Sequence, residues 1–152
     1  YLKLWFLAFL IFFGITFVHQ DAFANRLSFW QNAALNSPHL ALAQRNLGAM
    51  YYLDKNYDLA EIYSEKALAL NPKEEMAHNN LGLVAMARGQ LGKAKEEYLK
   101  ELSFNPYYDS AHYNLGLLYY QIGDFVNARK QWEETYRLNP NYGGIVEALL
   151  SL

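Results

Sequence analysis

The sequence predicts an all-α fold, a right-handed α-solenoid of helix-turn-helix units preceded by a transmembrane helix. Two observations predict it: a pattern that returns every 34 residues between positions 38 and 140, and an uncharged apolar stretch at residues 4–18. The composition agrees with a folded chain, because 16% of the 152 residues are aromatic. Cys is absent, which excludes a disulfide framework and a thiolate metal site. The net charge of −2 provides no basic field for nucleic acid.

The apolar stretch at residues 4–18 reads LWFLAFLIFFGITFV. With its flanks it is about 17 residues long, the lower end of what a bilayer span requires. We expect residues 1–20 to form a transmembrane helix that associates the protein with a membrane. A secretory signal peptide is one alternative, since Lys3 precedes the stretch and residues 22–24 have the small-x-small form of a cleavage site. A helix buried in a soluble core is the other, although a segment that is apolar on every face suits it least.

Four columns of residues recur at the same 34-residue interval and in the same register. Such agreement between independent columns is very unlikely to arise by chance. They are the Asn-Pro pairs at 71–72, 105–106 and 139–140; Leu47, Leu81 and Leu115; Gly48, Gly82 and Gly116; and Ala60, Ala94 and Ala128. Such a fixed period is the sequence signature of a repeat architecture, in which each unit stacks on its neighbours.

Each unit is expected to contain two helices, and the last unit shows why. Residues 110–121 carry Leu and Tyr at spacings of three and four, and Gly123 then interrupts the pattern. Residues 125–138 place apolar residues on one helical face. This helix should end at Asn139, because a residue that precedes Pro avoids the helical region.

The three units span residues 38–72, 73–106 and 107–140, and the first two are interrupted at residues 55–56 and 88–90. Their small Gly and Ala columns allow the two helices of a unit to approach closely. No unit can bury its apolar face alone, so we expect the units to stack into a solenoid.

The same phase extends beyond the three units. Trp30 and Ala33 fall into register with it, so we expect residues 21–37 to be the second helix of a degenerate repeat, joined almost directly to the membrane segment. Leu149 continues the Leu column, so residues 141–152 should form a helix that caps the open end of the stack.

This pattern resembles the tetratricopeptide repeat family over residues 38–140, about two thirds of the chain. Each unit has the family's Leu-Gly pair, a later Ala and a closing Pro. Ala85 and Ser64 depart from the family's aromatic columns, and Glu101 and Thr135 replace a usual Ala, so we expect looser contacts there. The resemblance implies a solenoid whose concave surface is lined by the first helix of each unit and binds a protein or peptide.

On that concave surface, the resemblance implies a ladder of Asn46, Asn80 and Asn114, each directly before a Leu-Gly pair. An Asn amide can donate to one backbone carbonyl and accept from one backbone N–H, so a row of them can hold an extended peptide. The ladder is similar to that of the O-linked N-acetylglucosamine transferases. The alternative is that these amides make hydrogen bonds between helices. The other groove residues that the resemblance implies are Arg45, Tyr52, Asn79, Leu83, Met86, Tyr113, Leu117 and Tyr120.

This lining is apolar and aromatic with one cation, which suits adaptable recognition of peptide side chains. A clamp for a C-terminal carboxylate needs several Lys or Arg, but the family's other clamp positions hold Ala49 and Ser110, so we do not expect one. Burial of the lining beneath the capping segment is the alternative to binding. If the ladder binds, Asn80→Ala combined with Asn114→Ala should weaken partner binding with little change in thermal stability.

No residues form a credible catalytic, cofactor or metal site, so we expect no enzymatic activity in this chain. The pair Gly92-Lys93 lacks the earlier Gly and the Ser or Thr of a phosphate loop. His78 and His112 are 34 residues apart, and such equivalent positions indicate packing or groove residues rather than metal ligands.

The sequence favours a membrane-anchored scaffold that binds a protein segment in its groove. Because the chain begins with Tyr1, we expect it to be a piece of a longer protein. The alternative function is therefore the acceptor-binding tail of a membrane glycosyltransferase. Residues 25–38, NRLSFWQNAALNSP, are similar to part of the polytopic membrane proteins related to protein O-mannosyltransferases, which implies repeats on the extracytoplasmic side. The ends of the solenoid could also mediate self-association.

Overall fold

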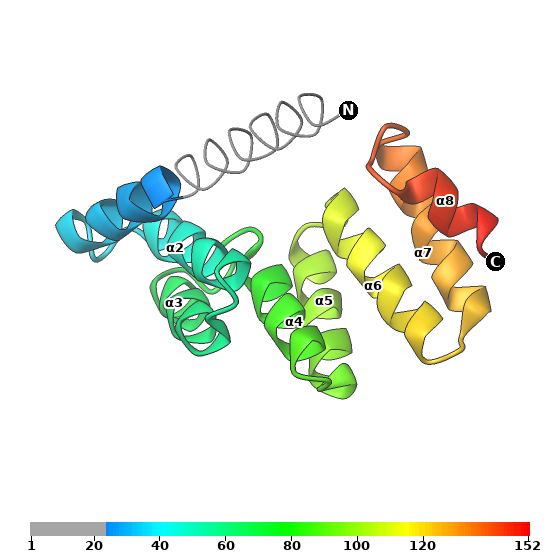
Figure 1. The fold of residues 1–152 in the computed structure, drawn as a ribbon, viewed down its shortest axis with the longest axis horizontal. Coiled ribbons are helices and arrows are strands. Elements are labelled where there is room, and N and C mark those ends of the chain that lie inside the picture. The colour runs from blue at the N-terminus through cyan, green and yellow to red at the C-terminus, as the bar shows by residue number, and fades with distance from the viewer. Residues whose placement is uncertain (1–23) are drawn as a thin grey trace, which may run out of the picture.

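The computed structural model describes residues 24–152, and the regular structure in this range is entirely helical. Residues 24–36 form the first helix. It is followed by α2 (Ala41–Leu53), α3 (Tyr57–Leu70), α4 (Ala77–Ala87), α5 (Leu91–Phe104), α6 (Asp109–Gln121), α7 (Phe125–Leu138) and α8 (Ile145–Leu150). Figure 1 shows α2 to α7 as a row of helix pairs, with α8 beside α7 at the end of the row. The all-α solenoid predicted from the sequence is confirmed.

The transmembrane helix predicted for residues 1–20 lies outside the described part of the chain. Within residues 24–152, none of the helices combines the length and the apolar character that a membrane crossing requires. The structure therefore leaves the predicted membrane segment untested.

Successive helices pack as the repeat pattern predicts. The pairs are α2 with α3, α4 with α5, and α6 with α7, and each second helix also packs on the next pair through the contacts of α3 with α4 and of α5 with α6. The first helices contact one another as well, α2 with α4 and α4 with α6. One face of the row is thus built from first helices alone, and it is on this face that a groove was expected.

The turn inside each pair depends on one residue with a positive φ angle. These residues are Lys55, Gly89 and Gly123, with φ of 60°, 72° and 78°, and they are again 34 positions apart. They occupy the interruptions seen in the sequence. Glycine adopts this left-handed conformation readily, whereas Lys55 does so at a steric cost.

The turn that leaves each second helix begins at an Asn that precedes Pro. Asn71, Asn105 and Asn139 have φ of −142°, −129° and −146° and therefore leave the helical region. This is the conformation expected of a residue before Pro.

The columns of small residues lie where the two helices of a pair cross. A Cβ atom added to Gly82 would overlap the ring of Tyr98, and one added to Gly116 would overlap the ring of Trp132. Both aromatic side chains are only 1% exposed. The glycine in the first helix therefore provides the space that the large side chain of the second helix fills. The Ala column, Ala60, Ala94 and Ala128, is 0% exposed.

Two departures from the repeat pattern have opposite effects. The carboxylate of Glu101, which is 2% exposed, accepts hydrogen bonds from the backbone N–H of Met76 at 2.8 Å and of Asn79 at 3.2 Å. It thus lies at the N-terminus of α4, where negative charge is stabilising, and adds a contact instead of loosening one. Ser64 is buried, and its hydroxyl has no hydrogen-bond partner among residues 24–152, which lowers stability, while the looser contact expected there stays a prediction.

Both ends of the row carry further helical segments. Trp30 and Ala34 of the first helix pack against Ala43 and Leu47 of α2. At the other end, Ile145 of α8 is 1% exposed and joins the apolar core that includes Leu115 and Trp132. The assignment of residues 21–37 to a degenerate repeat and of residues 141–152 to a cap stays a prediction.

Candidate functional site

A cavity of about 290 Å³ opens on the face formed by the first helices. α2, α4 and α6 all contribute to it, together with the turns that precede α6 and α8. Its lining consists of Ala49, Tyr52, Leu53, Asn79, Asn80, Leu83, Tyr108, Ser110, Asn114 and Tyr142. This lining brings the three repeats together in one site.

Five of the eleven candidate groove residues line this cavity. They are Tyr52, Asn79, Asn80, Leu83 and Asn114. The other six, Arg45, Asn46, Met86, Tyr113, Leu117 and Tyr120, lie outside the lining.

The Asn ladder makes hydrogen bonds between neighbouring first helices. Asn80 Nδ2 donates to the backbone carbonyl of Arg45 at 3.3 Å, and Asn114 Nδ2 donates to Oδ1 of Asn79 at 2.9 Å. Asn79 and Asn80 are 3% and 6% exposed. The amide N–H groups thus join one repeat to the next, which was the alternative considered for the ladder. Asn46 is half-buried and lies outside the cavity.

Arg45, the cation expected in the groove, points into the joint between the first two repeats. Its side chain is 9% exposed, with Nε 3.8 Å from Glu74 Oε1 and Nη1 against the sulfur of Met76. Its guanidinium group thus forms an ion pair with Glu74, although Nε makes no hydrogen bond within residues 24–152, and it is not part of the cavity lining.

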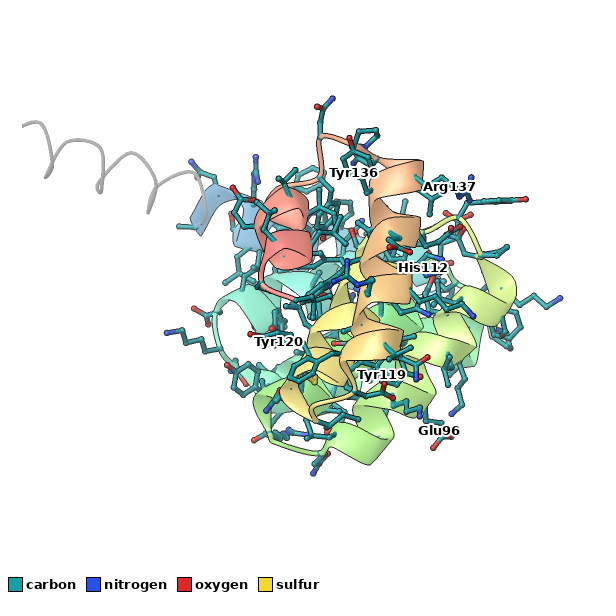
Figure 2. All side chains as sticks on the ribbon, turned by 90° about the vertical axis from the view of Figure 1, so that its right-hand side faces the viewer. Glu96, His112, Tyr119, Tyr120, Tyr136 and Arg137 are labelled. Atoms are coloured by element: carbon teal, nitrogen blue, oxygen red, sulfur yellow. The ribbon has the colours of Figure 1, made fainter. Side chains whose placement is uncertain are left out.

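Tyr113 and Tyr120 pack against aromatic side chains instead of lining the cavity. The ring of Tyr113 lies 4.8 Å from that of Tyr142. The ring of Tyr120, labelled in Figure 2 at the end of α6, lies 5.6 Å from Trp132 and 5.5 Å from Phe125. These contacts join α6 to α7 and to the segment before α8.

Met86 and Leu117 are the remaining candidates outside the cavity. Met86 packs against the apolar core that contains Leu115 and Trp132. Leu117 is 38% exposed. Neither side chain is placed where it would contribute to the lining.

Five lining residues were not among the eleven candidates. Ala49 and Ser110 were named only as positions of a carboxylate clamp, and Leu53, Tyr108 and Tyr142 were not named at all. A sequence signal for two of them exists, because Tyr108 and Tyr142 are 34 positions apart and each precedes a helix of the row. Leu53 has no such signal, since Ala87 occupies the equivalent position of the second repeat.

The cavity carries no charged side chain, and its surface is more apolar than polar. Burial raises the pKa of Tyr108 to about 12, and it also raises the pKa of Tyr52, with a smaller contribution from Tyr57. These phenols are therefore neutral at physiological pH and can donate hydrogen bonds. The lining combines them with the Asn amides and with the apolar side chains of Leu53 and Leu83.

The two His residues of the repeat column pack between the helices of a pair. His78 Nδ1 lies 2.7 Å from Glu97 Oε2, and His112 Nδ1 lies 2.7 Å from Gln131 Oε1. Figure 2 shows His112 beside α7. Burial favours the neutral form of Glu97, but hydrogen bonds from His78 and Lys100 outweigh it and lower its pKa. No cluster of three or more metal-ligating side chains occurs between residues 24 and 152.

A second cavity, of about 500 Å³, lies between the first helix and α3. It is lined by Ala34, Leu35, Pro38, Gln44, Tyr63, Lys66, Ala69 and Leu70. It involves the first helix and the first of the three repeats only, so it does not use the feature that the three repeats share.

Family models match three parts of the chain. Two models described as Tetratricopeptide repeat match residues 43–74 and 110–142, and a model described as TPR repeat matches residues 84–123. The chain contains tetratricopeptide repeats. No curated protein matches the sequence significantly. These comparisons do not support the resemblance to proteins related to O-mannosyltransferases, which stays a prediction.

Solved tetratricopeptide repeat structures share the fold at low sequence identity. The crystal structure of MamA is 19% identical, with a TM-score of 0.70 over 86% of this chain and 77% of that one. The first TPR of Spaghetti (RPAP3), bound to the HSP90 peptide SRMEEVD, is 20% identical, with a TM-score of 0.68 over 73% and 88%. The NMR structure of the first TPR domain of human RPAP3 is 21% identical, with a TM-score of 0.70 over 75% and 90%. Identities this low show the fold alone.

Proposed function

We propose that this chain is a protein-interaction module that binds an extended segment of another protein in the cavity of its first helices. One observation carries the proposal: three repeats converge on a single open cavity that combines amides, phenols and apolar side chains. Polar groups of this kind can pair with a peptide backbone, while the apolar ones accept its side chains. A similar fold binds a peptide in the RPAP3 structure, which supports the proposal.

The carbonyl oxygens of the ladder are the groups most suited to this role. One amide N–H of Asn80 and one of Asn114 donates between helices, while their Oδ1 atoms accept no hydrogen bond within residues 24–152. Each Oδ1 could accept from a backbone N–H of a bound segment. The hydroxyls of Tyr52, Tyr108 and Tyr142 could donate to its carbonyls.

Site-specific photo-crosslinking tests this proposal in cells. A photo-crosslinking amino acid at Leu53, a lining residue that is 59% exposed, should form adducts with a partner protein. The matched control is Leu99, which is 45% exposed and lies on α5, a second helix that does not line the cavity. Equal adduct formation at both positions, or adducts at Leu99 alone, would contradict a cavity-centred interface.

We further propose that residues 4–18 anchor the module to a membrane, with the repeats on the extracytoplasmic side. The uncharged apolar stretch in the sequence supports the anchor. After alkaline extraction of cell membranes, the full chain should stay in the membrane pellet, and protease added outside the cell should digest the repeats. Release of the chain into the supernatant would contradict the membrane anchor. Protection of the repeats from the protease would contradict their extracytoplasmic location.

The alternative, an acceptor-binding tail of a membrane glycosyltransferase, is favoured by residues 25–38 alone. It assigns the same segment-binding role to the repeats. Determining the sequence upstream of Tyr1 separates the two proposals. Several further membrane spans with an acidic pair in the first outer loop would favour the glycosyltransferase, and a short leader that begins with Met would favour the scaffold.

Self-association through the solenoid ends is a separate proposal. Val126 and Leu150, near the C-terminal end of the row, are each 81% exposed, which supports an apolar contact there. Light scattering of the purified chain should show a dimer that Val126→Glu dissociates, and a monomer at all concentrations would contradict it.

A further inference from the structure

The cavity lacks cations throughout its lining. All ten lining residues are uncharged, and Arg45, on the same helix as Ala49, is buried against Glu74 and Met76. A ligand that enters the cavity therefore meets amides, hydroxyls and apolar groups, but no positively charged group.

Two acidic side chains lie close to Ser110 and Tyr108, at one end of the lining. Ser110 Oγ lies 3.2 Å from Asp109 Oδ1, and Asp109 is held in place by Asn139 Nδ2 at 2.8 Å from Oδ2. Glu101 and Asp109 both act electrostatically on the phenol of Tyr108, which lines the cavity. The field at this end of the cavity therefore disfavours anions, and a desolvated cation would also lack a partner, because no carboxylate belongs to the lining.

An acidic ligand would be disfavoured in such a site for two reasons. A carboxylate that leaves water requires a charged or strongly hydrogen-bonding partner, because burying an unpaired charge is costly. The Asn amides are neutral donors and therefore provide no charged partner, and one of the two N–H groups of Asn80 and of Asn114 already donates to another repeat. The RPAP3 structure offers a contrast, because the peptide bound there, SRMEEVD, has three acidic residues.

An uncharged ligand fits the same groups well. The Oδ1 atoms of the ladder and the phenols offer acceptors and donors that match a peptide backbone. Leu53, Leu83 and Ala49 line the apolar part of the cavity. Its volume of about 290 Å³ leaves room for small or medium apolar side chains.

We infer that the groove selects an uncharged internal segment of its partner, with apolar side chains, and excludes acidic segments and free C-terminal carboxylates. This inference rests on the proposed function, because it specifies the class of segment that the same cavity binds.

Capture of synthetic peptides by the immobilised full chain tests the inference. The probes are three heptapeptide libraries: one acetylated, amidated and uncharged, one with Asp or Glu at three positions and a free C-terminus, and one with Lys at three positions. Mass spectrometry compares captured with supplied peptide. We expect the uncharged library to be enriched over each charged library by about tenfold or more, which corresponds to about 1.4 kcal/mol.

A gain of cations should reverse this preference. Ala49→Lys with Ser110→Lys adds two ammonium groups on opposite sides of the cavity, and this variant should capture the peptide SRMEEVD, which the unchanged chain should not. Ile62→Lys with Leu99→Lys, two exposed positions on second helices, is the charge-matched control and should behave as the unchanged chain. Circular dichroism checks folding, and Ser110→Lys alone replaces the double variant if that one unfolds.

The outcomes separate this inference from the proposed function. Capture of the acidic or the basic library by the unchanged chain, at least as strong as that of the uncharged one, would overturn the inference and leave the groove as a peptide site. Capture of no library by the folded chain would overturn both.

Discussion

At the scale of single residues, the crossing of two helices depends on a glycine that faces a side chain of the second helix, which is large in the second and third pairs. Gly82 provides space for Tyr98, and Gly116 provides space for Trp132, sixteen positions later in each case. The first pair uses Ser64 at this position, and its Oγ lies 2.7 Å from where a Cβ on Gly48 would be. The repeated Leu-Gly pair is therefore a packing requirement of the helix pair.

Gly82→Ala tests this requirement directly. The added methyl group would overlap the ring of the buried Tyr98, so we expect the free energy of unfolding to fall by about 1–3 kcal/mol, as overpacking typically does. The matched control is Gly92→Ala in α5, where nothing lies within 4 Å of the new atom. There we expect a gain of about 0.5–1 kcal/mol, because Ala is the better helix former. Urea unfolding of both variants measures the difference, and equal effects would contradict the packing argument.

Asn80→Ala tests the hydrogen bonds of the ladder. The sequence alone suggested that thermal stability would change little, but the structure shows a buried amide bonded to the carbonyl of Arg45. Removing the donor deletes a buried hydrogen bond between repeats, although the carbonyl of Arg45 keeps its partner within α2, so we expect a loss of about 1 kcal/mol. Asn46→Ala is the control, because Asn46 is half-buried and should lose less than about 0.5 kcal/mol. If differential scanning calorimetry finds the two variants equally stable, the ladder has no role between repeats.

At the scale of helices, α4 begins at a left-handed residue that is not glycine, whereas the left-handed residue before α8 is Gly144. Its N-terminus has Met76 at a φ of 68° and no capping hydrogen bond from the Met76 side chain. The carboxylate of Glu101 on α5 instead accepts from two backbone N–H groups there. Glu101, which replaces the Ala that is usual in the family, thus provides the hydrogen-bond acceptor at the N-terminus of the neighbouring helix α4.

Glu101→Ala should therefore destabilise α4 by about 1–3 kcal/mol, because two buried N–H groups lose their acceptor. Glu96→Ala on the same helix is the control, since the side chain of Glu96 is 65% exposed and forms a surface ion pair with Lys100. Hydrogen exchange should show faster exchange in the first turn of α4 only for Glu101→Ala. Unchanged exchange there would show that the carboxylate does not stabilise this helix.

The packing of α4 against α5 also predicts a dependence on pH. The folded state lowers the pKa of Glu97 below its ordinary value of 4.5, so the ionised carboxylate binds its proton less readily than in the unfolded chain. Its contribution to stability is thus fully present above about pH 4.5 and is lost as the pH falls through the lower folded pKa. The melting temperature should fall more steeply below pH 4.5 in the unchanged chain than in Glu97→Gln. If the melting temperatures of the two proteins fall in parallel with pH, the ionised Glu97 does not contribute to stability.

At the scale of the whole molecule, the period of 34 was sufficient to predict the helix pairs and the turns between them. The repeated columns predict these elements because each residue type has a local structural role. Gly82 allows the close approach of Tyr98, and Asn105 ends its helix because Pro follows it. The predicted membrane segment lies outside the described residues and stays a prediction.

The site was less predictable, because its composition depends on contacts between repeats. The pairing of Arg45 with Glu74 removes a cation from the lining, and it joins residues 29 positions apart that belong to different repeats. Tyr142 reaches the cavity from the turn before α8. No periodicity within one helix reports such contacts, although the column of Tyr108 and Tyr142 was visible in the sequence.

The central claim is that the face of the first helices is where a partner segment binds. The most direct measurement is an NMR titration of the isotope-labelled chain with a peptide from the uncharged library. We predict that the shifted signals cluster on Tyr52, Leu83 and Asn114, including the side-chain amide of Asn114. Shifts confined to the outer faces of α3, α5 and α7 would contradict the account.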